Sequence, residues 1–268
     1  MRPRRLLVTL LGDYWRGHRE PIPSAALVEV LGEFGVSAQS ARSTLSRLTQ
    51  DGLLRRRKAG RRTYYHLTAR AQRAFDAGAT RIFGFGAETP TWDGAWSMVA
   101  FSIAERNRPL RHVLRARLRW LGYAPLYDGF WISPHDRGAE SLELLRDLKV
   151  DSATVIRGQV VGERNGASPL RAWDLEKLGH RYSSFIARFD PVMGLVTSEG
   201  LSPSRALVLR TEVMDAWRSF PREDPDLPTA FLPPRWPRAR ARALFASTYE
   251  ALAPLAESYF GEMVEKHR

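Results

Sequence analysis

Six polar side chains recur on one side of the segment from Ser37 to about Gln50, and none of them is acidic. They are Gln39, Arg42, Ser43, Ser46, Arg47 and Gln50. At 100° per residue the opposite side carries apolar residues such as Leu45 and Leu48, so the segment is predicted to be an amphipathic helix that Ser37 can cap. Arginine, glutamine and serine hydrogen-bond base edges and phosphates in the major groove of DNA. This side of the segment therefore has the chemistry of a recognition helix.

A basic hairpin is predicted directly after this helix. Residues 55–62 hold six basic side chains in eight positions and turn near Ala59-Gly60. The side chains that we expect to contact DNA here are Arg55, Arg56, Arg57, Arg61, Arg62 and Tyr64. Two amphipathic segments precede the recognition helix, one closed by Gly17 and one capped by Ser24 and ending at Gly35. Three helices and a basic hairpin predict a winged helix-turn-helix over residues 1–80; the alternative is a solvated charge run on an unrelated helical domain.

The net charge of the chain is concentrated at this end. The formal charge is +12 over 268 residues, and residues 1–81 hold 16 Lys or Arg against 6 Asp or Glu, a net of +10. Such an asymmetry favours a polyanion-binding module joined to a nearly neutral body. The absence of cysteine excludes disulfides, thiolate metal sites and cysteine nucleophiles, and we find no apolar run of 18 residues and no signal peptide. We expect a cytoplasmic protein that binds double-stranded DNA and no membrane.

Residues 90–165 are predicted to form a ferredoxin-like βαββαβ module. Alternating apolar residues over 95–104 indicate a strand, and a helix follows that Asn107 can cap and Gly122 ends. Asp128-Gly129 is the pair preferred in a type I′ hairpin turn, here between two further strands. A second helix around residues 142–148 and a last strand spanning residues 155–161 complete the pattern.

Residues 169–268 are predicted to be a mainly α-helical domain, which makes the whole chain a multidomain α+β protein. Apolar residues from Leu170 to Phe189 fit one long helix, and Ser202-Pro203 begins another. The proline-rich stretch 221–237 is predicted not to be helical and to form a linker or an ordered strap. A final helix from about Arg238 to Glu265 is predicted to bend at Pro254.

Four arginines form a stripe on the first helix of the middle module. They are Arg108, Arg111, Arg115 and Arg119, and the aromatic residues Tyr123, Tyr127 and Trp131 follow closely in the sequence. Arginines could hold the phosphates of a nucleotide-bearing ligand such as an acyl-coenzyme A while the aromatic rings hold its acyl part. A solvated helix face, a contact to the DNA backbone and a contact to a partner subunit remain alternatives.

No sequence motif supports catalysis. Gly84-Phe85-Gly86 is half of a dinucleotide fingerprint without its strand-turn-helix context, and the six histidines are scattered without a recognised ligand spacing. Asp93 is the one acid that a metal-dependent nuclease could use, although a turn cap is the simpler interpretation. We therefore predict no enzyme activity, no cofactor and no metal, with a nucleic-acid-processing enzyme built on the ferredoxin-like core as the alternative and constitutive nucleoid binding as a third possibility.

Ten short strings resemble the PaaX family, repressors of phenylacetic acid catabolism and related pathways. They are residues 10–14 (LLGDY), 34–36 (FGV), 41–48 (ARSTLSRL), 51–53 (DGL), 60–68 (GRRTYYHLT), 81–84 (RIFG), 92–96 (WDGAW), 129–134 (GFWISP), 217–221 (WRSFP) and 224–228 (DPDLP). The resemblance covers nearly the whole chain and implies a middle domain like that of small CRISPR-associated ferredoxin-fold proteins. It also implies a homodimeric repressor of transcription that phenylacetyl-coenzyme A, or another aromatic acyl-coenzyme A, releases from its operator. The arginine-rich hairpin departs from the family pattern and leaves the operator sequence open.

Overall fold

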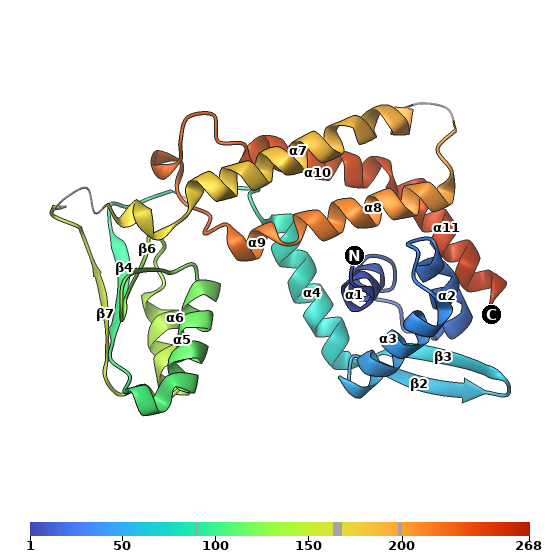
Figure 1. Cartoon of the computed structure of the whole chain (residues 1–268), viewed down its shortest axis with the longest axis horizontal. Helices are drawn as coiled ribbons and strands as arrows, with labels where there is room; N and C mark the ends of the chain where they lie inside the picture. The colour runs from blue at the N-terminus through green and yellow to red at the C-terminus, as the bar shows by residue number, and fades with distance from the viewer. Residues whose placement is uncertain (89–90, 163–167, 198–199) are drawn as a thin grey trace. The chain divides into compact units, whose positions relative to one another are not determined.

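The computed structural model describes residues 1–88, 91–162, 168–197 and 200–268, and divides them into two compact units. The first unit combines residues 1–87, 182–220 and 238–268, and the second combines residues 88–181 and 221–237. The chain is a mixed α+β protein with two small antiparallel sheets (Figure 1). No helix in the described part of the chain is long and apolar enough to cross a membrane.

The first unit begins with three helices and a small sheet. The helices are α1 (Pro3–Tyr14), α2 (Ser24–Gly32) and α3 (Ala38–Gln50), and the strands β1 (Ile22–Pro23), β2 (Leu54–Ala59) and β3 (Arg62–Leu67) pair in the order β1-β3-β2. Ser37 caps α3 as expected, because its Oγ accepts a hydrogen bond from the Ser40 amide at 3.3 Å. The prediction that Ser24 caps α2 was wrong: Pro23 is the extended N-cap residue because it pairs with β3, and Ser24 is already helical.

Five further helical segments complete this unit and share its apolar interior. They are α4 (Ala69–Gly84), the part of α7 (Leu175–Thr197) from residue 182 onward, α8 (Pro203–Trp217), α10 (Arg238–Ala251) and α11 (Ala253–Lys266). Helix α8 packs against α1, α10 and α11, and α11 also packs against α2. The ring of Tyr14 in α1 stacks on that of Phe260 in α11, with centroids 4.9 Å apart. The N-terminal helices therefore share one core with the C-terminal helices.

The second unit contains a four-stranded sheet covered by two helices. Its elements follow in the order β4 (Trp96–Phe101), α5 (Arg108–Trp120), β5 (Ala124–Tyr127), β6 (Phe130–Ser133), α6 (Gly138–Asp147) and β7 (Ala153–Gly158). The strands lie in the order β5-β6-β4-β7 with antiparallel neighbours. Helices α5 and α6 lie side by side on one face of this sheet (Figure 1).

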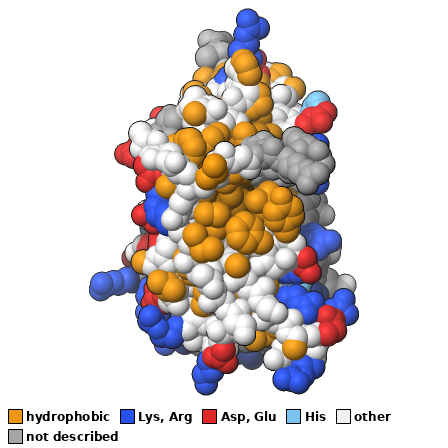
Figure 2. Space-filling view, turned by 90° about the vertical axis from the view of Figure 1, so that its left-hand side faces the viewer, with side chains coloured by type: hydrophobic (Ala, Val, Ile, Leu, Met, Phe, Trp, Pro, Cys, Tyr) orange, Lys and Arg blue, Asp and Glu red, His pale blue; other side chains and the backbone are white. Residues whose placement is uncertain are grey.

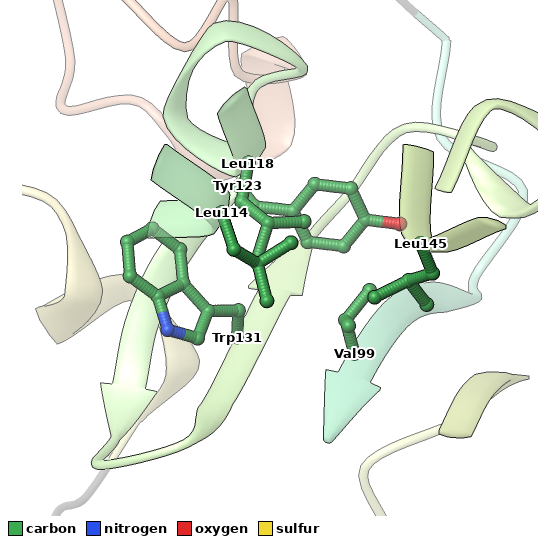
Figure 3. Packing of buried hydrophobic residues seen from close by; sticks show 6 residues of the cluster. All are labelled: Val99, Leu114, Leu118, Tyr123, Trp131 and Leu145. Atoms are coloured by element: carbon green, nitrogen blue, oxygen red, sulfur yellow. The ribbon is translucent and has the colours of Figure 1, made fainter. Parts of the chain in front are cut away.

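A compact apolar cluster holds these helices to the sheet. Its buried members are Val99, Leu114, Leu118, Tyr123, Trp131 and Leu145, which come from the sheet, α5, α6 and the turn between α5 and β5 (Figure 3). Val99 pairs with Trp131 across β4 and β6 and with Val155 across β4 and β7. Other apolar side chains remain at the surface: Ile156 is 41% exposed, and Figure 2 shows a face of the molecule on which apolar side chains gather.

Four further predictions about helices and strands differ from the structure. Leu170 lies in a short 3-10 helix, η2 (Pro169–Ala172), and α7 starts only at Leu175, because Asp174 Oδ1 accepts a hydrogen bond from the Lys177 amide and starts a new helix. The final helix is two helices, α10 and α11, since Pro254 stands in the first turn of a new helix. The proline-rich stretch does contain helical turns, α9 (Phe220–Glu223) and η3 (Thr229–Phe231), and β7 ends at Gly158.

Candidate nucleic-acid interface

The outer side of α3 is a continuous polar surface, which we call the α3 face. Gln39, Arg42, Ser46, Arg47 and Gln50 are exposed there and Ser43 is half-buried. The opposite side of the helix is buried and holds Ala41, Thr44, Leu45 and Leu48. Arg47 Nη2 donates a hydrogen bond to Ser43 Oγ at 3.0 Å, which holds the guanidinium along the helix surface. The α3 face is thus a set of donors and acceptors on a rigid element.

The hairpin β2–β3 continues this basic surface. Its exposed basic side chains are Arg55, Arg56, Arg57, Lys58, Arg61 and Arg62. Arg55 pairs with His66 and Arg57 with Tyr64 across the two strands. The turn needs a left-handed residue, which Gly60 supplies with a φ of 57°. The hairpin thereby presents guanidinium groups on an element of fixed register.

All six acidic residues of the first 81 have partners of their own, or are buried. Asp51 bonds to Arg4 at 3.0 Å, Asp76 lies 3.7 Å from Arg16, and the Oδ2 atom of Asp13 is buried. The other three contact α11 or the residues that follow it: Glu33 accepts from Tyr259 at 2.6 Å, Glu29 from Lys266 at 2.7 Å, and Glu20 from Arg268. The hydrogen bonds from Lys266 and His267 hold the pKa of Glu29 below its usual value. The positive potential of the α3 face and the hairpin is therefore not cancelled locally.

Two of the DNA contacts expected in the hairpin bond to residue 268. The main-chain oxygen of Arg268 accepts hydrogen bonds from the guanidinium of Arg62 and, at 3.2 Å, from the hydroxyl of Tyr64. Sequence reasoning missed that the basic segment 266–268 lies beside the hairpin, because no local pattern pairs residues 200 positions apart. Its run of Lys, His and Arg was the one available signal.

The arginines of α5, which we call the α5 stripe, have neighbours of a different kind. Arg111 bonds to Glu105 at 2.8 Å and to the Ile103 carbonyl at 2.7 Å, and Arg115 bonds to Asp128. The Arg119 guanidinium lies 5.2 Å from the centroid of the Trp131 ring, and Arg108 is exposed. Three arginines of the α5 stripe thus already interact with groups of the same unit, two with carboxylates and one with an aromatic ring.

The aromatic residues near the α5 stripe do not converge on an open site. Trp131 is 1% exposed and Tyr123 is 2% exposed, both inside the apolar cluster, whereas Tyr127 is 61% exposed. The Tyr123 hydroxyl accepts a hydrogen bond from Ser141 Oγ at 2.9 Å, and burial raises the pKa of Tyr123. A ligand that met the α5 stripe at the surface would find Arg108, Arg119 and Tyr127 rather than the whole predicted set.

Asp93 has the contacts of a turn cap. Its Oδ1 accepts a hydrogen bond from the Ala95 amide at 3.0 Å and its Oδ2 accepts one from Arg157, and these bonds lower the pKa of Asp93. Among residues 1–88, 91–162, 168–197 and 200–268, no group of three His, Asp or Glu side chains could hold a metal ion. A nuclease would need a carboxylate that is available to the ion, and both Asp93 oxygens are engaged.

Comparisons with known proteins give one consistent family. Three successive family models match the chain: "PaaX-like protein" over residues 2–71, "PaaX protein central Cas2-like domain" over residues 89–169 and "PaaX-like protein C-terminal domain" over residues 173–262. The chain is 28% identical to the "Transcriptional repressor PaaX" of Escherichia coli (strain K12), with 97% of this chain and 83% of the relative covered. Its fold is similar to that of the solved "Uncharacterized protein Rv0674 from Mycobacterium tuberculosis", with a TM-score of 0.60 at 20% identity over 93% of this chain and 96% of the other. Because the three models follow one another over nearly the full length, the chain belongs to the PaaX family.

Proposed function

We propose that this protein is a DNA-binding transcriptional regulator that represses its target genes and leaves its operator when a small ligand binds. One observation carries the proposal: the α3 face and the hairpin form a basic, acid-free surface while every acid of the same segment is paired or buried elsewhere. In this proposal the first three helices and the hairpin act as a winged helix-turn-helix. The relative named as a transcriptional repressor supports the same class of function.

Each part of the surface has a proposed role. Helix α3 enters the major groove, where Arg42, Ser43 and Arg47 read or position the bases and Gln39, Ser46 and Gln50 flank them. The hairpin lies along phosphates or the minor groove, with Arg55, Arg56, Arg57, Arg61, Arg62 and Tyr64 as anchors. A two-fold operator would be bound by a homodimer, since protein symmetry then matches DNA symmetry.

The second unit is the proposed site of regulation. Its strand order and helix positions support a ferredoxin-like module. The α5 stripe is the candidate for phosphate recognition in an acyl-coenzyme A, with Arg108, Arg119 and Tyr127 as the accessible members. Phenylacetyl-coenzyme A is the first ligand to test because the family resemblance implies it.

Fluorescence anisotropy tests the whole proposal. The full-length protein is titrated onto labelled DNA from upstream of its own gene at several salt concentrations, with excess random DNA, and then with phenylacetyl-coenzyme A or with free coenzyme A as the matched control. Binding that survives random DNA and is lost only with the thioester is expected. Binding that resists both compounds would move the search to other aromatic or acyl ligands, and equal binding to all DNA would contradict the repressor proposal.

A further inference from the structure

The end of α11 and the two residues after it bind two acids of the N-terminal region. Lys266 Nζ donates a hydrogen bond to Oε1 of Glu29 in α2 at 2.7 Å, and His267 Nε2 donates one to Oε2 of the same carboxylate at 2.6 Å. The Arg268 guanidinium donates to Glu20, which precedes β1. Hydrogen bonds between a charged donor and a carboxylate are the stronger kind. These three residues are therefore attached to two separate parts of the region that carries the α3 face.

The same segment also contacts the outer part of the hairpin. The main-chain oxygen of Arg268 accepts hydrogen bonds from Arg62 and Tyr64 of β3. Strand β1 pairs with β3 as far as Pro23 opposite Tyr64, and beyond that point, in the described structure, β3 pairs with β2 alone. A two-stranded hairpin is at best marginally stable by itself. The bonds to Arg268 thus give the hairpin an attachment near the point where the sheet narrows to two strands.

Helix α11 provides a firm base for this segment. Phe260 and Val264 are 3% and 2% exposed, and α11 packs against α2 and α8. Tyr259 of α11 donates a hydrogen bond to Glu33, just after α2, at 2.6 Å. Buried apolar side chains of this kind resist displacement, because moving them would open cavities in the core. The core of the first unit therefore sets the position of segment 266–268, and the segment in turn restrains the hairpin.

We propose that the three residues of segment 266–268 are positioning residues of the DNA interface: they bind α2 through Glu29 and hold the hairpin in the orientation in which its guanidinium groups reach phosphates. This inference rests on the proposed function of the α3 face and the hairpin. Arg62 is exposed while it bonds to Arg268, so the bond restrains the side chain without covering it. A hairpin that is ordered before DNA arrives loses less conformational freedom on binding, and this strengthens binding.

Glu29 allows a positioning role to be told apart from a purely electrostatic one. Residues 1–81 carry a net charge of +10, and Glu29 is one of their six acids. Removing a negative charge from a region that binds DNA raises its positive potential, so an electrostatic role alone predicts tighter binding. Losing the hydrogen bonds to Lys266 and His267 frees the hairpin, so a positioning role predicts weaker binding. The two roles therefore give opposite signs for the same substitution.

Fluorescence anisotropy of the full chain on operator and random DNA, over several salt concentrations, tests the sign. For Glu29→Ala we expect affinity to fall about fivefold and the slope of log affinity against log salt to fall by about one, because fewer hairpin cations reach phosphates. Glu33→Ala is the matched control: it removes an acid just after α2 and a bond to Tyr259 of α11, but leaves the bonds of segment 266–268 in place. Its affinity and slope should not fall below those of the natural protein. Tighter binding by both variants would overturn the positioning role.

Glu29→Gln separates the hydrogen bonds of Glu29 from its charge. Glutamine lacks the charge, as alanine does, but keeps a carbonyl oxygen that can accept a hydrogen bond from Lys266 or His267. We therefore expect Glu29→Gln to recover part of the salt slope that Glu29→Ala loses. Identical slopes for the two variants would contradict positioning through this contact, since charge is the property that they share.

Hydrogen exchange of the backbone amides tests the attachment without DNA. In Glu29→Ala, amides of β2 and β3 near the turn should exchange several-fold faster than in the natural protein, while amides of α8 should keep their rates. His267→Ala removes a donor from the other side of the same contact and should have the same effect, which covers the case in which Glu29→Ala does not fold. Unchanged hairpin exchange in both variants would overturn the attachment. Absence of DNA binding by the natural protein and every variant would refute the proposed function instead, and the exchange rates would still decide whether segment 266–268 holds the hairpin.

Discussion

The α3 face and the α5 stripe both contain arginines, but the acidic residues near them are placed differently. The acidic residues of the segment that carries the α3 face pair with residues outside that face: Arg4, Arg16 and the residues at and beyond α11. Along the α5 stripe, Glu105 and Asp128 bond directly to Arg111 and Arg115. Arginine content alone does not distinguish a polyanion-binding surface from a solvated helix face, whereas the placement of the acids does.

The two regions also differ in the buried residues that pack beneath the arginines. Behind the α3 face, Leu45 and Leu48 are fully buried, so polar and apolar sides are cleanly separated. Behind the α5 stripe, Trp131 fills the apolar cluster while its ring also meets Arg119. An aromatic ring that supports a core has little freedom to accept a ligand.

The largest expected effect separates core from ligand site in the second unit. Trp131→Ala should destabilise the protein by about 3–5 kcal/mol, because it leaves a cavity in the cluster under α5. Arg119→Ala removes only the exposed cation above the same ring and should cost about 0.5–1 kcal/mol. Urea and thermal unfolding measure both. Near-equal small losses in stability, with acyl-coenzyme A binding abolished by Trp131→Ala, would show that the ring lines a site.

Arg47→Ala probes the α3 face directly. If Arg47 reads a guanine, the variant should lose about 1–3 kcal/mol of operator binding and relax sequence preference at one position. Ser46→Ala, a neighbouring exposed change without loss of charge, should cost less. Anisotropy against the operator and against random DNA separates the roles: equal losses on both for Arg47→Ala would assign Arg47 to phosphate instead.

Arg61→Ala and Arg62→Ala compare two adjacent anchors with different partners. Arg61 is exposed, so its loss should weaken binding to all DNA alike and lower the slope of log affinity against log salt by about one. Arg62 already bonds to the main-chain oxygen of Arg268, so its loss should lower that slope by less. Salt titrations give both slopes, and a larger change for Arg62 would mean that DNA displaces segment 266–268.

Much of the local structure was predictable because its signals are local. The Ser37 cap and the turn at Gly60 appear where residue type and spacing indicate them. The Asp128-Gly129 hairpin turn is also present, but it is not of type I′, because Gly129 has a positive φ of 73° and Asp128 does not have a positive φ. The start of α2 was missed because pairing of Pro23 with β3 is a tertiary contact. The break before α11 was placed only approximately, since a proline at the start of a helix and a proline inside a bent helix give the same sequence pattern.

The partners of the site residues were beyond sequence reasoning. The α3 face follows from helical periodicity, but nothing local indicates that Glu29 bonds to Lys266 or that Arg210 bonds to the Tyr249 carbonyl. Trp131 was placed near a ligand for its proximity in sequence to the α5 stripe, and its burial depends on strand pairing with Val99. Long-range packing therefore decides which polar residues are available.

The smallest expected effect is on Arg108, an exposed member of the α5 stripe to which no carboxylate is bonded in the described structure. Arg108→Ala should leave operator affinity and the salt slope unchanged if DNA meets only the α3 face and the hairpin. It should weaken an acyl-coenzyme A ligand several-fold if the stripe holds phosphate, because one charge-assisted contact is lost. Anisotropy with and without the thioester measures both, with Arg146→Ala of α6 as a control exposed arginine of the same unit. A salt slope that is reduced in Arg108→Ala but not in Arg146→Ala would show that the α5 stripe also contacts DNA. That result would contradict the distinction between the α3 face as a DNA-binding surface and the α5 stripe as one that DNA does not contact.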